Sequence, residues 1–185
     1  DRRERKRERL LRDSRLPSGK TLGTLEEGQL PAKVRRQWPT LLEGGFVERA
    51  ENLLVFGLPG RGKTHFLCAL GRELIWRHGC PIYFTPTFKL VQQLLTAKKD
   101  LRLDAVLKKL DRFEAVILDD LGYVQQSREE MEVLFTFLAE RYERRSVWIS
   151  SNLVFSKWDQ IFKDPMTTMA AVDRLVHHAT ILEFD

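Results

Sequence analysis

The sequence predicts an α/β protein in which a five-stranded parallel sheet is covered by helices on both faces. Short runs rich in β-branched and aromatic residues recur along the chain, separated by helical stretches. These runs are apolar on both faces, as expected of strands that are buried from both sides. The 185 residues, 43% of them hydrophobic, suffice for one domain with its own core. The expected strands cover residues 53–56, 81–85, 115–119, 146–151 and 180–184.

The segment before the first strand carries all of the excess positive charge. Residues 1–36 hold 12 Lys/Arg and 6 Asp/Glu, whereas residues 37–185 hold 19 and 20. Arg and Glu alternate at helical spacings in DRRERKRERLLRDSR, which suits a charged helix or a solvated tail. An arginine-rich segment that contacts phosphates is equally compatible. We expect residues 1–20 to be a basic helical segment and linker, the end of a larger N-terminal region, and residues 21–185 to be the main domain.

The first strand runs into a glycine-rich stretch, GLPGRGKTH. Its glycines permit positive φ angles and let backbone N–H groups converge on an anion at the N-terminus of the next helix. The stretch fits the P-loop pattern G-x-x-x-x-G-K-[ST] in full. Lys63 would reach the β- and γ-phosphates of a nucleotide, and the Thr64 hydroxyl would sit on Mg²⁺. The predicted nucleotide-binding residues are Gly57, Leu58, Pro59, Gly60, Arg61, Gly62, Lys63, Thr64 and His65.

The third strand ends in two acids, Asp119 and Asp120. Ligands of open α/β sheets bind outside the carboxyl ends of the strands, so both carboxylates should face the phosphates. We expect Asp119 to hold Mg²⁺ as a Walker B acid and Asp120 to act as general base toward the attacking water. An Asp-rich turn after a core strand is the alternative.

Asn152, after the fourth expected strand, and Arg174, before the fifth, each have a functional and a purely structural interpretation. Asn152 could orient water against a γ-phosphate, or it could begin a turn through local hydrogen bonds. Arg174, on the helix before the last strand, could pair with Asp173 or extend along apolar surface. It could also be an arginine finger, which at this position would act on a neighbour's nucleotide and would imply an oligomer.

The other metal-ligating residues form no site in the sequence. The adjacent His177 and His178 would point apart on a helix, so we expect no metal site there without further ligands. Cys68 and Cys80 lack metal spacing and are expected to be small buried residues or loop thiols in a reduced, cytosolic setting. No apolar run approaches the ~20 residues that span a bilayer, and no membrane partner is expected.

Three stretches and the basic N-terminal lead are characteristic when taken together: GLPGRGKTH, VILDDLGYVQQSREEMEVLFTFLAERYERRSV and SSNLVFSKWDQIFKDPMTTMAAVDRLVHH. They resemble the IstB-like AAA+ ATPases, helper proteins of insertion-sequence transposition that are related to DnaC-type helicase loaders. The resemblance covers about Arg9 to Glu183. It implies a P-loop NTPase of the AAA+ type with strand order 5-1-4-3-2, ATP and Mg²⁺ as cofactors, and assembly into a ring or spiral. It also implies Asn152 as sensor I and Arg174 as a finger acting in trans.

The resemblance further implies a helical insertion between the second and third strands that contacts DNA. Here this region is TFKLVQQLLTAKKDLRLDAVLKKLDRF, with Lys98 and Lys99 as the expected phosphate contacts. Arg128, after the Walker B acids, faces the same channel in relatives. Ser127 is explained equally well by a capping box with Glu130. The implied partners are double-stranded DNA and a transposase, in the bacterial cytoplasm.

Three features depart from the family pattern. The chain ends where relatives continue toward the sensor II arginine, so we expect the domain to be truncated before that residue. Leu58 and Arg61 replace small residues at permissive positions of the P-loop. Asp120 stands where most AAA+ proteins have Glu, although IstB-like proteins commonly carry Asp, and slow hydrolysis would suit a switch.

The implied function is that of an ATPase that oligomerises on duplex DNA, selects target DNA and stimulates a transposase. A DnaC-like replicative helicase loader and a non-hydrolysing DNA-coating protein are the alternatives within this fold. A P-loop kinase of a small metabolite would need an acceptor pocket and a lid arginine cluster. The sequence between the Walker B acids and Asn152 offers only an amphipathic helix over about residues 127–144.

Overall fold

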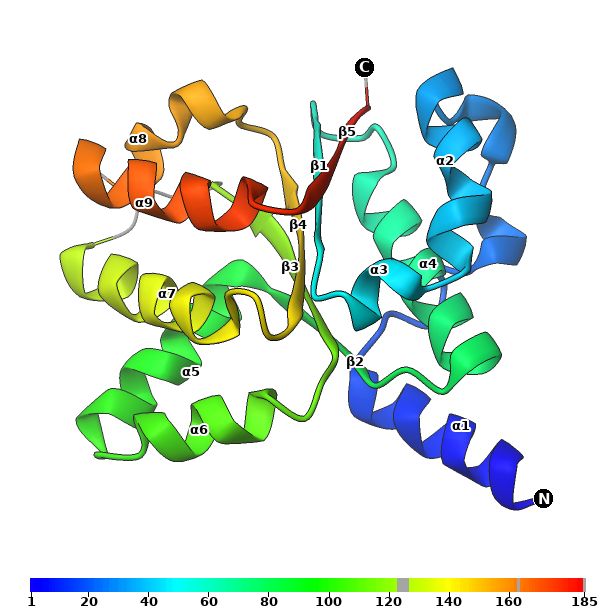
Figure 1. Cartoon of the computed structure of the whole chain (residues 1–185), viewed down its shortest axis with the longest axis horizontal. Helices are drawn as coiled ribbons and strands as arrows, with labels where there is room; N and C mark the ends of the chain where they lie inside the picture. The colour runs from blue at the N-terminus through cyan, green and yellow to red at the C-terminus, as the bar shows by residue number, and fades with distance from the viewer. Residues whose placement is uncertain (123–126, 163, 185) are drawn as a thin grey trace.

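The structure, a computed structural model, describes residues 1–122, 127–162 and 164–184. A five-stranded parallel sheet in the order β2-β3-β4-β1-β5 forms its centre (Figure 1). Read from the other edge, this is the predicted order 5-1-4-3-2, so the fold class and the strand order are confirmed. The strands lie within two residues of their predicted bounds: β1 (Asn52–Gly57), β2 (Ile82–Pro86), β3 (Ala115–Leu121), β4 (Ser146–Ser151) and β5 (Ala179–Phe184).

Helices cover both faces of the sheet (Figure 1). One face carries α1 (Arg2–Ser14), η1 (Leu22–Thr24), η2 (Glu27–Gln29), α2 (Ala32–Leu42), α3 (Gly45–Glu48) and α4 (Lys63–His78). The other carries α5 (Thr87–Lys99), α6 (Leu103–Leu110), α7 (Arg128–Arg141), η3 (Phe155–Lys157), α8 (Asp159–Phe162) and α9 (Pro165–Val176). Leu53 and Val55 of β1 belong to the first apolar core, and Leu54 and Phe56 belong to the second. This alternation explains why residues 53–56 of the strand are all apolar.

The basic N-terminal helix α1 packs against the domain. Arg7 is buried, and its Nε donates to the carbonyl of Trp76 at 3.3 Å, near the C-terminal end of α4. Leu10 and Leu11 pack against the first core, while most of the other basic side chains of α1 are exposed. The segment therefore forms the charged helix of the first interpretation. Phosphate contact by its exposed face and a domain boundary at residue 20 stay predictions.

The capping box predicted at the start of α7 is confirmed. Ser127 Oγ accepts from the Glu130 N–H at 3.2 Å, and Glu130 Oε1 accepts from the Ser127 N–H at 3.1 Å. The helix ends at Arg141, three residues before the predicted end. The buried guanidinium of Arg141 donates to backbone carbonyls of Leu110, Phe113 and Ser146. These hydrogen bonds hold the end of α7 next to the start of β4.

Asn52 joins three elements at the amino edge of the sheet. Its buried amide Nδ2 donates to the carbonyl of Leu175 at 3.0 Å, and its Oδ1 accepts from the N–H of Val147 at 2.9 Å. The side chain thus connects the start of β1 to α9 and to β4.

We expect Asn52→Leu to lower the free energy of unfolding by about 2–4 kcal/mol, because two buried backbone groups would lose their partners. The melting temperature should fall by roughly 5–10 °C. Thermal and urea unfolding would measure both quantities. Gln93→Leu, at an exposed position of α5, is the control and should stay within about 0.5 kcal/mol of the parent. Equal losses in the two variants would contradict the role given to Asn52.

Candidate functional site

The P-loop lies at the carboxyl edge of the sheet, between β1 and α4 (Figure 1). Gly60 and Gly62 have φ angles of +81° and +88°, a region that L-residues seldom adopt. A Cβ atom at either position would meet nothing within 4 Å, so the backbone conformation is what requires glycine there. Gly57 has a different reason: a Cβ would lie 2.3 Å from the backbone oxygen of Phe184. Gly57 therefore makes room for β5, and its place in the nucleotide site stays a prediction.

Lys63, the first residue of α4, lies across its own loop. Its Nζ donates to the carbonyl of Gly57 and, at 2.8 Å, to that of Leu58. The side chain is buried, and this burial lowers the pKa of the ammonium group. A phosphate above the loop would offer anionic acceptors in place of the two carbonyls.

Asp119 is the centre of a hydrogen-bond cluster at the end of β3. Its Oδ1 accepts from Thr64 Oγ1 at 2.7 Å and from Ser150 Oγ at 2.6 Å. Oxygen ligands of an octahedral Mg²⁺ lie ~2.9 Å apart, given Mg–O distances of ~2.0–2.1 Å. The Thr64 hydroxyl and the Asp119 carboxylate therefore fit the hard oxygen ligand set of this ion. Both residues were predicted from the sequence, but no role was predicted for Ser150. A hydroxyl at a buried strand position was the one sign that its side chain has a polar partner.

Asp120 owes its position to an irregularity in β3. The pairing with β4 shifts register between Leu118 and Leu121, and Asp120 has a φ angle of +59°. Its N–H donates to Ser150 Oγ at 2.9 Å. Partial burial and the adjacent Asp119 carboxylate raise the pKa of Asp120, while Lys63 opposes them. Bulges of this kind re-aim side chains next to active sites, and here Asp120 is exposed beside the buried Asp119.

Asn152 and Arg174 lie at opposite ends of the parallel strands, Asn152 at the carboxyl ends and Arg174 at the amino ends. Asn152 follows β4 directly and is exposed, next to the carboxyl end of β1. Arg174 lines a small cleft with Asn52 and Val147, at the amino ends of β1 and β4. Its guanidinium lies 5.0 Å from the ring centre of Phe135 and 6.0 Å from that of Tyr142. Arg174 therefore points away from the P-loop of its own subunit.

The segment before α2 packs over the P-loop. Nothing in the sequence indicated this contact. Thr24 Oγ1 lies 2.9 Å from His65 Nε2, and the same nitrogen lies 3.0 Å from the carbonyl oxygen of Thr21. A cavity of about 480 Å³ separates this segment from the P-loop; its lining includes Leu25, Gln29, Leu30, Gly60, Gly62 and Phe184. Such a volume suits a nucleoside. The many turn residues of this segment favoured a linker in the prediction. In the structure its Leu22 and Leu25 pack against the core.

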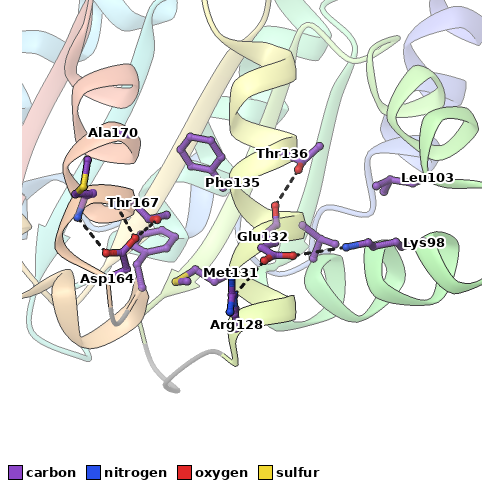
Figure 2. A pocket seen from close by; sticks show the side chains of 13 residues that line it. Lys98, Leu103, Arg128, Met131, Glu132, Phe135, Thr136, Asp164, Thr167 and Ala170 are labelled. Atoms are coloured by element: carbon purple, nitrogen blue, oxygen red, sulfur yellow. Dashed lines mark hydrogen bonds and ion pairs between the residues drawn. The ribbon is translucent and has the colours of Figure 1, made fainter.

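Two of the three basic residues expected to contact DNA meet at one carboxylate. Glu132 of α7 lies between them: Lys98 Nζ is 3.6 Å from its Oε2, and Arg128 Nε is 3.4 Å from its Oε1 (Figure 2). All three line a cavity of about 890 Å³ with residues of α8 and α9. Lys99 is exposed at the end of α5. The insertion is helical as predicted, formed by α5 and α6.

The burial expected of the two cysteines is confirmed, whereas the expectation that the two adjacent histidines point apart on a helix is wrong. Cys68 and Cys80 are buried thiols, and burial raises the pKa of Cys68 to about 12. α9 ends at Val176, so His177 and His178 do not have the spacing of helical residues, and their ring centres lie only 4.1 Å apart.

None of the helices in the described part of the chain is both long and apolar enough to span a bilayer.

The chain matches the family model of the IstB-like ATP binding protein over residues 1–185. It is 43% identical over 186 residues to an insertion sequence ATP-binding protein of Sinorhizobium fredii, covering 100% of this chain and 62% of that protein. It is 38% identical over 181 residues to an ATP-binding protein of insertion sequence IS21 from Pseudomonas aeruginosa, covering 98% and 68%.

A solved structure of the DnaC helicase loader shares the fold, with a TM-score of 0.67. The similarity covers 91% of this chain and 98% of that chain at 18% sequence identity, so it concerns the fold alone. Together with the family match over residues 1–185, this similarity confirms the resemblance drawn from the P-loop and the later stretches. The chain therefore belongs to the IstB-like ATP binding proteins and has their AAA+ fold.

Proposed function

We propose that this protein binds ATP with Mg²⁺ at its P-loop, hydrolyses it slowly, and uses this cycle as a DNA-binding helper of transposition in the bacterial cytoplasm. One observation carries the nucleotide part: the hydroxyls of Thr64 and Ser150 converge on a single buried carboxylate oxygen of Asp119 beside the P-loop. The match to a family of ATP binding proteins supports the choice of nucleotide. The names of the relatives, which refer to insertion sequences, support the cellular role.

Each residue has a distinct task in this proposal. The N–H groups around Gly60 and Gly62 and the ammonium of Lys63 bind the phosphates. Thr64 and Asp119 would hold Mg²⁺, which supplies charge neutralisation on the phosphate oxygens when it is bound. Asp120 accepts the proton of the attacking water. Asn152, at the adjacent strand end, orients that water.

The arginine finger has to come from another subunit. Arg174 lies at the amino edge of the sheet, whereas the P-loop lies at the carboxyl edge, about 20 Å away along a six-residue strand. Its planar guanidinium is suited to a neighbour's γ-phosphate. Stacking of subunits into a ring or spiral would place one Arg174 at each nucleotide.

DNA contact by Lys98, Lys99 and Arg128 is the less direct part of the proposal. Exposed basic side chains on adjacent helices can contact phosphates, but the shared partner Glu132 offsets part of their charge. A single subunit should therefore bind duplex weakly, and an assembly should bind it strongly by effective concentration.

A replicative helicase loader is the second candidate, because the DnaC helicase loader has the same fold. Sequence identity favours the insertion-sequence proteins, at 43% against 18%. A pull-down of a purified transposase against a purified replicative helicase would separate the two functions. A non-hydrolysing coat protein would show no turnover stimulated by DNA.

Lys63→Ala should abolish ATP binding, because the loop would lose its cation. Asp120→Asn should keep the affinity and lower turnover by about 10²–10⁴-fold, as expected for the loss of a general base. Titration with a fluorescent ATP analogue and measurement of phosphate release would give both quantities. An unchanged ATP affinity of the Lys63 variant would refute the nucleotide site.

Arg174→Ala should leave ATP binding by the single subunit intact and lower both ATP-dependent assembly and turnover. Arg174→Lys should restore only part of the activity, since an ammonium cannot reproduce the planar fork. Sedimentation with ATP and duplex DNA would report assembly. Full assembly and full turnover of the Ala variant would exclude a finger at this position.

Replacing Lys98 and Lys99 together by Ala should weaken binding to all duplex sequences alike. The slope of log K against log salt should flatten by about 1.8, or roughly 0.9 for each lost phosphate contact. Glu132→Gln should act in the opposite direction and tighten binding, because it frees Lys98 and Arg128. Fluorescence anisotropy at several salt concentrations would measure these changes.

The matched control is the replacement of Lys108 and Lys109, an exposed lysine pair on α6, by Ala. It removes the same charge from the same insertion and should change the slope less. If both double variants flatten the slope equally, the effect is one of net charge, and the contact assigned to Lys98 and Lys99 is wrong.

A further inference from the structure

Two turns at the amino edge of the sheet bring three possible metal ligands together. Glu143 lies in the turn between α7 and β4, and His177 and His178 lie in the turn between α9 and β5. One ligand atom of each residue lies within 4.8 Å of the others. Among the residues that the structure describes, this is the one such group of three His, Cys, Asp or Glu side chains.

The backbone of both turns holds the side chains in this arrangement. Glu143 and His178 each have a φ angle of 60°. Residues other than glycine seldom occupy this left-handed region, and those that do concentrate at functional positions. Because His178 leaves the helical conformation, its ring lies beside that of His177, at 4.1 Å between centres.

One of the three ligand distances matches a tetrahedral ion, and the other two are no longer than 4.8 Å. His177 Nε2 lies 3.1 Å from Glu143 Oε1. In a zinc site with Zn–N and Zn–O bonds of ~2.0–2.1 Å, neighbouring ligand atoms lie ~3.3 Å apart. Two imidazoles and one carboxylate suit Zn²⁺ and its transition-metal neighbours, whereas Mg²⁺ prefers oxygen ligands alone.

The surroundings favour a cation at this point. α9 ends at Val176, so its C-terminal carbonyl groups, the negative end of the helix dipole, lie next to the two histidines. The three ligands are exposed, so an ion can reach them from solvent.

We propose that Glu143, His177 and His178 form a binding site for a divalent transition-metal ion such as Zn²⁺, with water in the remaining position. The site is separate from the Mg²⁺ site at Thr64 and Asp119, which lies at the other edge of the sheet. A bound ion would fasten the α7–β4 turn to the end of α9. The alternative is that His177 and Glu143 form only a surface ion pair.

The test is a Zn²⁺ titration of the nucleotide-free full chain in excess Mg²⁺, followed by calorimetry and thermal unfolding. We expect one ion per chain and a rise in melting temperature of roughly 5–10 °C at a hundred times the dissociation constant. His177→Ala and Glu143→Gln should each weaken binding at least about tenfold. Without metal, both variants should melt close to the parent, because the residues are exposed.

His78→Ala is the matched control, since His78 is exposed and bonds to the carbonyl of Leu42, away from the cluster. It should bind Zn²⁺ as the parent does. Histidine-ring NMR spectra resolve the chain's four imidazoles: the signals of His177 and His178 should shift on titration, and those of His65 and His78 should not. Absence of stoichiometric binding, full binding by His177→Ala, or shifts confined to His65 or His78 would each overturn the proposal.

Discussion

The geometry of the candidate site depends on one buried carboxylate oxygen. Asp119 Oδ1 accepts hydrogen bonds from α4 through Thr64 and from β4 through Ser150. A carboxylate that is removed from water needs such partners, so the three elements are held in one relative position. Ser150 also accepts from the N–H of Asp120, which ties the left-handed conformation of Asp120 to the same cluster. The P-loop, the residues proposed to bind Mg²⁺ and the proposed general base are thus positioned together.

A parallel sheet divides the chemistry of the chain between two edges. The P-loop and Asn152 follow strand ends and Asp119 lies near the end of β3, so they share the carboxyl edge. Arg174 comes before β5 and therefore belongs to the amino edge, where it packs on Phe135. The strand is about 20 Å long, which is more than an arginine side chain can reach in any rotamer. If Arg174 serves a nucleotide, it serves one bound to a neighbouring subunit, and this follows from strand direction alone.

Local patterns predicted most of the fold and the centre of the site. Apolar runs predicted the strands, the P-loop spacing predicted the strand–loop–helix unit of β1 and α4, and Ser127 with Glu130 predicted the start of α7. What escaped prediction depends on packing between distant segments. His65 meets Thr24 only because the linker folds back on the P-loop, and the end of α7 depends on carbonyls of α6 and β4 that bind Arg141. Likewise, the two histidines converge only because α9 stops before them.

The distribution of charge supports the proposal that a single subunit binds DNA weakly. In sequence, the basic residues form dense runs, but in the fold several of them are engaged. Arg7 is buried at the end of α4, and Lys98 and Arg128 share Glu132. Exposed ion pairs contribute only about 0–1 kcal/mol, so phosphates can displace Glu132, yet each displacement reduces the gain from contact. Under the proposed function, strong binding would require many subunits on one duplex, and DNA affinity would then be coupled to assembly through Arg174.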